Sequence, residues 1–170
     1  MFKKILIPTD GSPLSSMAAL EGVDLARRIG AEIVGIYVAR ENQNPAFDFS
    51  DIRPKHYPSQ QEYKDAIMQA GEAFLKPVQE AAEKAGIKFT RLIAISNATA
   101  RQIVKSAHEN ECDLIYMGSH GCAGWGNVLL GSVATKVLST SLIPVLVYKF
   151  KREQVPQKAM REHLDVIPGV

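Results

Sequence analysis

The chain has 170 residues, of which 46% are hydrophobic and 22% charged, and its formal net charge is +2. This length suits one well-packed domain and is too short for two domains of ordinary size. Because the charges nearly cancel, we expect neither nucleic acid nor a membrane surface as a partner. No apolar stretch is long enough to span a bilayer.

The first strand and helix are predicted from residues 3–30. Residues 3–8 are rich in β-branched side chains and predict a strand, and a helix follows that ends at Gly30. Ser12 is typical of an N-cap, and Pro13 of the first helical position. The inner side of this helix is expected to hold Leu14, Ala18, Leu25 and Ile29, with Gly22 where the helix can approach a sheet.

The same alternation continues along the chain. Further strands are expected at 31–39, 88–95, 112–119 and 144–149, and helices at 61–86, 98–110 and 132–141. Pro77 lies inside the longest helix and is expected to kink or split it. Residues 41–62 hold three prolines and predict a long loop. We therefore expect one domain over residues 1–150 and a polar tail over residues 151–170.

Alternating strands and helices, with several strands apolar on both faces, predict an α/β fold. Its expected form is a doubly wound, five-stranded parallel sheet with helices on both faces. Such sheets bind ligands beyond the carboxyl ends of their strands, where the strand order reverses. Polar, glycine-containing loops follow the first strand at residues 8–12 and the fourth at residues 118–132. If these strands are neighbours, the two loops share one crevice.

The second of these loops is dense in glycine. Five glycines lie between Gly118 and Gly131, and Ser132 follows at once. A tight turn that needs positive φ angles would account for one or two of them. The alternative is a backbone that approaches an anion at a helix N-terminus, and the number of glycines favours it.

Two common phosphate-binding motifs do not fit this loop. Residues 126–132 have the glycine spacing of a Walker loop, but Ser132 stands at the lysine position and the loop follows the fourth strand. A dinucleotide fingerprint fails because Leu129 occupies its third glycine position. A Walker-type nucleotide hydrolase and a dinucleotide site are thereby excluded.

The spacing that does fit is G-2x-G-9x-G-(S/T), formed by Gly118, Gly121, Gly131 and Ser132. With the stretches KKILIPTDGSPLS, CDLIYMGSHG and LLGSVATKVLSTSLIPVLVYK, it resembles the universal stress protein family in its ATP-binding branch. The resemblance covers about residues 1–150. It implies an adenine nucleotide alpha hydrolase-like fold with the strand order 3-2-1-4-5.

The resemblance implies a site for ATP, with Mg²⁺ on its phosphates. Gly118 and Gly121 would let the backbone approach ribose and phosphates, while Gly131 and Ser132 would present N–H groups and a hydroxyl. His120 lies within the motif, either as a general base or as a solvated loop residue.

Further residues are placed in this site by the same resemblance. Asp10 would bond the nucleotide or help to hold the metal ion, although an Asx turn or a helix cap explains it equally well. Val38 would contact adenine through its backbone. The crevice would also include Pro8, Thr9, Met117 and Val133.

The chain departs from the family where Cys122 and Asn127 replace residues that are often basic. Each lost charge-assisted bond would contribute about 1.5 to 3 kcal/mol. Three functions remain open: a nucleotide-responsive binding protein, a slow ATP hydrolase, and an interaction module without nucleotide. The enzymes that cleave ATP on related sheets use an S-G-G-x-D-S loop, which PTDGSPLS does not match.

The last strand predicts the oligomeric state of the protein, and the cysteines predict its cellular compartment. Residues Val145 to Tyr148 are expected at an open sheet edge, where a second copy can pair, as related proteins do. Cys112 and Cys122 form no CxxC pair or metal-ligand set, so two free thiols in a reducing cytoplasm are expected. Pro8 and Asp10 interrupt the only apolar run that resembles a signal peptide.

Overall fold

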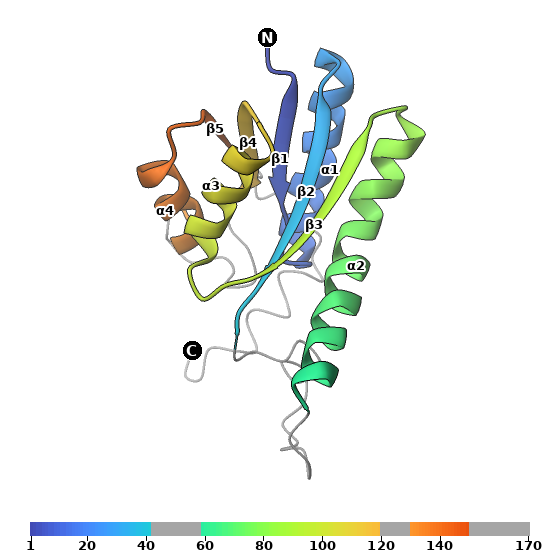
Figure 1. Ribbon diagram of the computed structural model, residues 1–170. Coiled ribbons are helices and arrows are strands. Elements are labelled where there is room, and N and C mark those ends of the chain that lie inside the picture. The colour runs from blue at the N-terminus through green and yellow to red at the C-terminus, as the bar shows by residue number, and fades with distance from the viewer. Residues whose placement is uncertain (42–58, 120–129, 150–170) are drawn as a thin grey trace, which may run out of the picture.

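The computed structural model describes residues 1–41, 59–119 and 130–149. These ranges form a parallel sheet in the order β3-β2-β1-β4-β5, flanked by helices (Figure 1). The predicted doubly wound fold and strand order are confirmed. The strands are β1 (Lys4–Pro8), β2 (Glu32–Ala39), β3 (Phe89–Ile95), β4 (Leu114–Gly118) and β5 (Val145–Tyr148), and the helices are α1 (Pro13–Ile29), α2 (Gln60–Lys84), α3 (Thr99–Glu109) and α4 (Ser132–Thr140).

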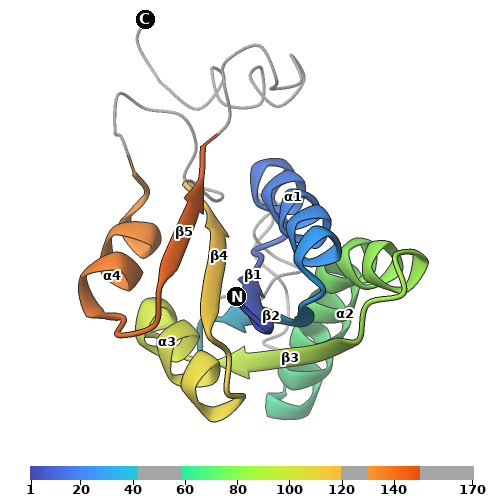
Figure 2. The same ribbon diagram turned by 90° about the horizontal axis from the view of Figure 1, so that it is seen from above.

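Helices cover both faces of the sheet. Figure 2 shows α1 and α2 on one side and α3 and α4 on the other. Ile5 and Ile7 of β1 belong to the core cluster on the α1–α2 side, whereas Leu6 belongs to the cluster on the α3–α4 side. All three are at most 1% exposed. Burial of each side chain contributes about 1.5 to 3 kcal/mol to stability. Because its side chains are buried on both faces of the sheet, β1 is the centre of the fold.

Helix α1 begins and ends as its sequence predicts. Ser12 is the N-cap, and Gly30 ends the helix in a left-handed conformation with φ 71°. The expected inner face is confirmed: Leu14 and Ala18 are buried, and Leu25 and Ile29 are partly buried against the core cluster. Ala19, Val23 and Ala26 are buried as well. The close approach expected at Gly22 is also confirmed, since a Cβ added there would lie 2.8 Å from side-chain atoms of Ile7 and Tyr116. At this one position a side chain would not fit between α1 and the sheet.

Helix α2 corrects the expected start of the helix and excludes one of the two effects expected of Pro77, a split, while a kink stays a prediction. It begins at Gln60, because Ser59 and Glu62 form a reciprocal capping box, so the expected loop of residues 41–62 ends earlier. Pro77 does not split the helix, which is continuous to Lys84. Pro77 and Ala73 are both exposed, so the Ala73 carbonyl that loses its helical partner can bind water.

Within the described ranges, no helix is long and apolar enough to cross a bilayer.

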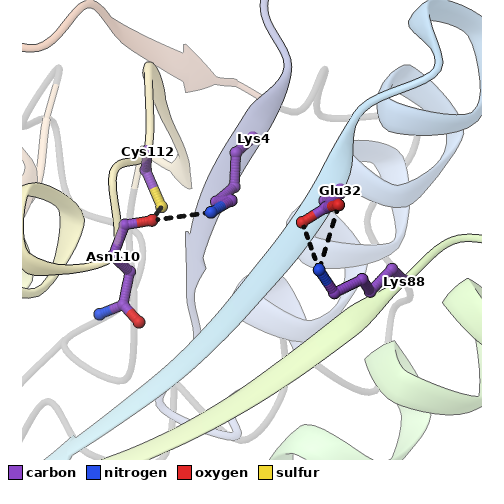
Figure 3. Close-up of polar contacts among 5 residues, drawn as sticks. All are labelled: Lys4, Glu32, Lys88, Asn110 and Cys112. Atoms are coloured by element: carbon purple, nitrogen blue, oxygen red, sulfur yellow. Dashed lines mark hydrogen bonds and ion pairs between the residues drawn. The ribbon is translucent and has the colours of Figure 1, made fainter.

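Polar contacts tie the strands together at the amino end of the sheet (Figure 3). The Lys88 ammonium lies 3.2 Å from the Glu32 carboxylate and joins the start of β3 to that of β2. The Lys4 ammonium donates to the Asn110 carbonyl at 3.2 Å. These contacts lie at the end of the sheet opposite to the predicted ligand site.

The thiol of Cys112 is free and buried, in agreement with the expectation for this residue. Its sulfur lies 4.0 Å from the Asn110 carbonyl oxygen (Figure 3). Burial raises the pKa of Cys112 to about 11, so the thiol stays protonated and unreactive at neutral pH. Cys122 lies outside the described residues.

Candidate functional site

Strands β1 and β4 are neighbours in the sheet, which is the condition for a shared crevice. Ile5 pairs with Leu114 and Leu6 with Ile115, in parallel. The loops that follow the two strands therefore leave the sheet at the same edge. This is the position where the strand order reverses, because the chain first adds β2 and β3 on one side of β1 and then β4 and β5 on the other.

Residues 9–12, here called the β1–α1 turn, are fixed by hydrogen bonds. The Thr9 N–H donates to the Ile36 carbonyl at 2.9 Å and ties the turn to β2. Asp10 Oδ1 accepts from the Ser12 N–H at 3.0 Å and from the Ser12 hydroxyl at 2.7 Å. Asp10 thus forms an Asx turn that orients the N-cap of α1. Its contact with a nucleotide or metal ion stays a prediction.

Two buried hydroxyl groups support this turn from behind. Thr9 and Ser15 are 5% and 7% exposed, and the Ser15 hydroxyl donates to Thr9 Oγ1 at 3.1 Å. The Asp10 N–H donates to Ser15 Oγ at 3.2 Å, and the Gly11 N–H to Thr9 Oγ1 at 3.3 Å. Sequence reasoning missed Ser15. The sequence does hold a signal for this pair: a serine three residues after the N-cap can reach back to a threonine three residues before it.

The two ends of the glycine-rich segment meet at the carboxyl end of β4. The Gly131 N–H donates to the Ser119 carbonyl at 2.7 Å, and the Ser119 N–H donates to the Tyr148 carbonyl at 2.9 Å. Ser119 is 5% exposed and is a second residue that sequence reasoning missed. His120 and Gly121 are among the predicted site residues and lie outside the described residues.

The start of α4 differs from expectation in one group. We expected the Gly131 N–H to face phosphate, but this N–H is donated to Ser119. The first helical bond runs from the Thr135 N–H to the Gly131 carbonyl at 3.0 Å, and the N-cap residue, Gly131, has no side chain that could cap the helix. The N–H groups of Ser132 and Val133 lie in this first turn, where a helix offers no acceptor of its own. They are the donors that an anion at this end would meet.

The backbone of Gly131 does not require glycine. Its φ of −64° and ψ of 157° are open to any residue. A positive φ angle therefore does not explain this glycine. Two explanations remain: glycine is among the residues favoured at an N-cap, and a side chain here would occupy space that a ligand needs.

The apolar residues predicted for the site lie on one side of the sheet. Val38, Met117 and Val133 come from β2, β4 and α4 and belong to the cluster on the α3–α4 side. Met117 is 6% exposed, so it is a core residue first. Pro8 ends β1 and pairs with Ile36, two residues before Val38. Gly118 ends β4, and Ser132 is exposed at the start of α4.

In the part of the chain that the structure describes, no three His, Cys, Asp or Glu side chains lie close enough to hold a metal ion. Asp10 is the single carboxylate in the β1–α1 turn.

The fold defines a doubly wound α/β protein, and the β1–α1 turn and the end of β4 lie at the edge where the strand order reverses, which is the usual ligand position in such sheets. The sequence pattern of the universal stress protein family matches residues 1–149. The chain belongs to this family, as the resemblance in its glycine loop indicated.

The chain is similar to family members from other organisms, in sequence and in structure. Universal stress protein MJ0531 of Methanocaldococcus jannaschii is 33% identical over 158 residues, which cover 91% of this chain and 86% of that one. The solved structure of MJ0577 from the same organism has 29% identity and a TM-score of 0.71, covering 89% of this chain and 99% of that chain. A family protein of Arabidopsis thaliana, solved with AMP bound, has 15% identity and a TM-score of 0.61, covering 93% and 98%.

Proposed function

We propose that this protein binds ATP, with Mg²⁺, in the crevice between the β1–α1 turn and the start of α4, and acts through that binding. The observation that carries the proposal is the start of α4. A glycine whose backbone angles do not require glycine stands there as N-cap, without a capping side chain, beside the turn that follows the neighbouring strand β1. A phosphate group would accept from the first-turn N–H groups and gain from the helix dipole.

An adenine nucleotide suits the remaining surface. Val38, Met117 and Val133 offer apolar contact on the α3–α4 side, and the backbone of Val38 would bond the adenine ring. The AMP bound to the Arabidopsis family protein supports this class of ligand. Asp10 would help to hold Mg²⁺ on the phosphates, since a carboxylate and phosphate oxygens are the ligands that Mg²⁺ prefers. The triphosphate is chosen because the glycine spacing is that of the ATP-binding branch.

Mass spectrometry of small molecules released from gently purified protein tests this proposal, together with calorimetry of ATP binding in the presence of Mg²⁺. We expect released ATP or saturable binding of added ATP. Released AMP with no measurable ATP binding would correct the ligand. No nucleotide in either measurement would favour an interaction module of the same family that has lost its ligand.

We further propose a homodimer that pairs through β5. This strand is outermost in the sheet order, so one of its edges has no neighbouring strand in the described chain. Leu138, Leu142 and Leu146 are 41%, 92% and 37% exposed on or next to β5 and α4. An unpaired edge with exposed leucines favours pairing with a second copy, and the proposed setting is the cytoplasm, where the Cys112 thiol stays free.

Light scattering is expected to report a dimer for the wild type and a monomer for Leu146→Lys, because a charge on the edge strand opposes pairing. Met68→Lys is the matched control, since Met68 is 48% exposed on α2, away from β5. A wild-type monomer at all concentrations, or a dimer that survives Leu146→Lys and dissociates in Met68→Lys, would contradict an interface at β5.

Bound ATP is expected to be hydrolysed slowly or not at all. Phosphoryl transfer needs positively charged groups next to the γ-phosphate, which stabilise its negative charge. Ser132, Cys122 and Asn127 stand where basic residues would supply them. A single general base such as Asp10 or His120 contributes about 10² to 10⁴ in rate, which is too little for useful turnover. A single-turnover assay with labelled ATP checks this. A rate of about 1 s⁻¹ that Asp10→Asn abolishes would make the protein an enzyme.

A further inference from the structure

The ring of Phe74, on α2, lies directly against the backbone of Gly11 in the β1–α1 turn. A Cβ added at Gly11 would overlap ring atoms Cδ1 and Cε1 of Phe74 and lie 2.5 Å from Cγ. Gly11 also has a φ of 78°, which side chains with a Cβ rarely adopt. The turn and the ring therefore fit together because residue 11 has no side chain.

Helix packing, and not the turn, fixes the position of this ring. Phe74 packs edge-on against Tyr37 of β2, with ring centroids 5.2 Å apart and an interplanar angle of 79°. One helical turn earlier, a Cβ added at Gly71 would lie 2.7 Å from Ile93 and 3.0 Å from Tyr37. The close approach at Gly71 holds α2 against β2 and β3. The ring is thus presented to Gly11 by a helix that is anchored on the sheet.

The turn beneath the ring carries groups that the proposed nucleotide site uses. Its geometry depends on short bonds among Thr9, Asp10, Gly11 and Ser12, with donor-to-acceptor distances from 2.7 to 3.3 Å. Glycine has more accessible backbone conformations than any other residue, so Gly11 by itself would let this turn open. The aromatic ring removes part of that freedom by filling the space above Gly11.

We propose that Phe74 is a positioning residue for the nucleotide site, which holds the β1–α1 turn in the shape that aims Asp10 at the ligand. The effect of the Phe74 ring on the turn follows from its packing against Gly11. Its effect on ATP affinity rests on the proposed function. No residue of α2 belongs to the glycine signature, so this role comes from the tertiary structure.

The test compares Phe74→Ala with Val78→Ala, a truncation on the same helix whose side chain is 1% exposed and packs in the α1–α2 cluster, away from the turn. Hydrogen exchange is measured in the protein without nucleotide. The Gly11 and Ser12 amides are expected to exchange at least about tenfold faster in Phe74→Ala than in Val78→Ala, relative to the core amide of Ile36. Phe74→Leu, which keeps apolar volume and preserves folding if alanine does not, is expected to restore part of the protection.

Calorimetry with ATP and Mg²⁺ provides the second readout. ATP affinity is expected to fall at least about tenfold in Phe74→Ala, about 1.4 kcal/mol, and to stay unchanged in Val78→Ala. Equal exchange of Gly11 and Ser12 in the two variants would overturn the inference. So would a loosened turn with unchanged ATP affinity. If the wild type binds no ATP, the proposed function fails, and the exchange comparison alone decides whether Phe74 positions the turn.

Discussion

Replacing Gly131 with valine is expected to weaken ATP binding by at least tenfold, about 1.4 kcal/mol, as measured by calorimetry. The φ of −64° at Gly131 accepts valine without backbone strain. The branched side chain would stand at the start of α4, where the phosphates must approach the first-turn N–H groups. The change therefore acts on ligand access more than on folding, although valine is a poor N-cap residue.

A glycine at the opposite end of the sheet provides the control. Gly86 follows α2, has a φ of 69°, and has no atom within 4 Å of an added Cβ. Gly86→Asn introduces a side chain that this left-handed conformation tolerates, so ATP affinity is expected to stay at the wild-type value. Unchanged binding in a folded Gly131→Val variant would rule out the start of α4 as the phosphate site.

Replacing Asp113 with alanine is expected to lower the free energy of unfolding by about 2 kcal/mol. Oδ1 of Asp113 accepts from the Lys4 N–H at 3.0 Å, and Oδ2 accepts from the Lys3 N–H at 2.8 Å. The carboxylate thus extends the contact between β4 and β1 to residues that precede the first pair, Ile5 with Leu114. Hydrogen bonds to charged groups contribute about 1.5 to 3 kcal/mol each, and the exposed Lys3 bond counts for less. Urea unfolding measures the loss.

The same carboxylate makes stability depend on pH. Burial by itself raises the pKa of Asp113, but hydrogen bonds from the Lys4 and Lys3 backbone outweigh it and hold the pKa below its usual value. The stabilisation is therefore complete above the unfolded-state pKa of about 3.9 and is lost as the pH falls through the lower folded-state pKa. Between pH 5 and the acid transition, roughly, Asp113→Ala is expected to lose less stability than the wild type.

Asp24 is the control for this prediction. Its carboxylate pairs with Arg27 at 2.8 Å and with Arg28 at 2.6 Å on the exposed face of α1. Exposed ion pairs contribute little, so Asp24→Ala is expected to change unfolding at neutral pH far less than Asp113→Ala. Equal losses in the two variants would show that backbone bonding by Asp113 does not stabilise the sheet.

The sequence by itself determined the elements, their order and the family. Ser12 and Gly30 bound α1 because capping and left-handed φ angles are local properties of the backbone. Apolar strands alternating with helices specified a parallel sheet, since each strand must bury both faces. The spacing from Gly118 to Ser132 indicated the family, because such a loop is encoded over a few contiguous residues.

The tertiary structure decided the hydrogen-bond and packing partners of residues at the candidate site. The Gly131 N–H goes to Ser119, and the ring of Phe74 closes over Gly11, although neither pairing leaves a periodic signal in the chain. The tertiary structure also added Ala19, Val23 and Ala26 to the buried residues of α1, because the sheet covers a wider face of the helix than the predicted positions occupy. Such contacts depend on how helices sit against strands distant in sequence, and packing geometry fixes them only once the whole sheet has formed.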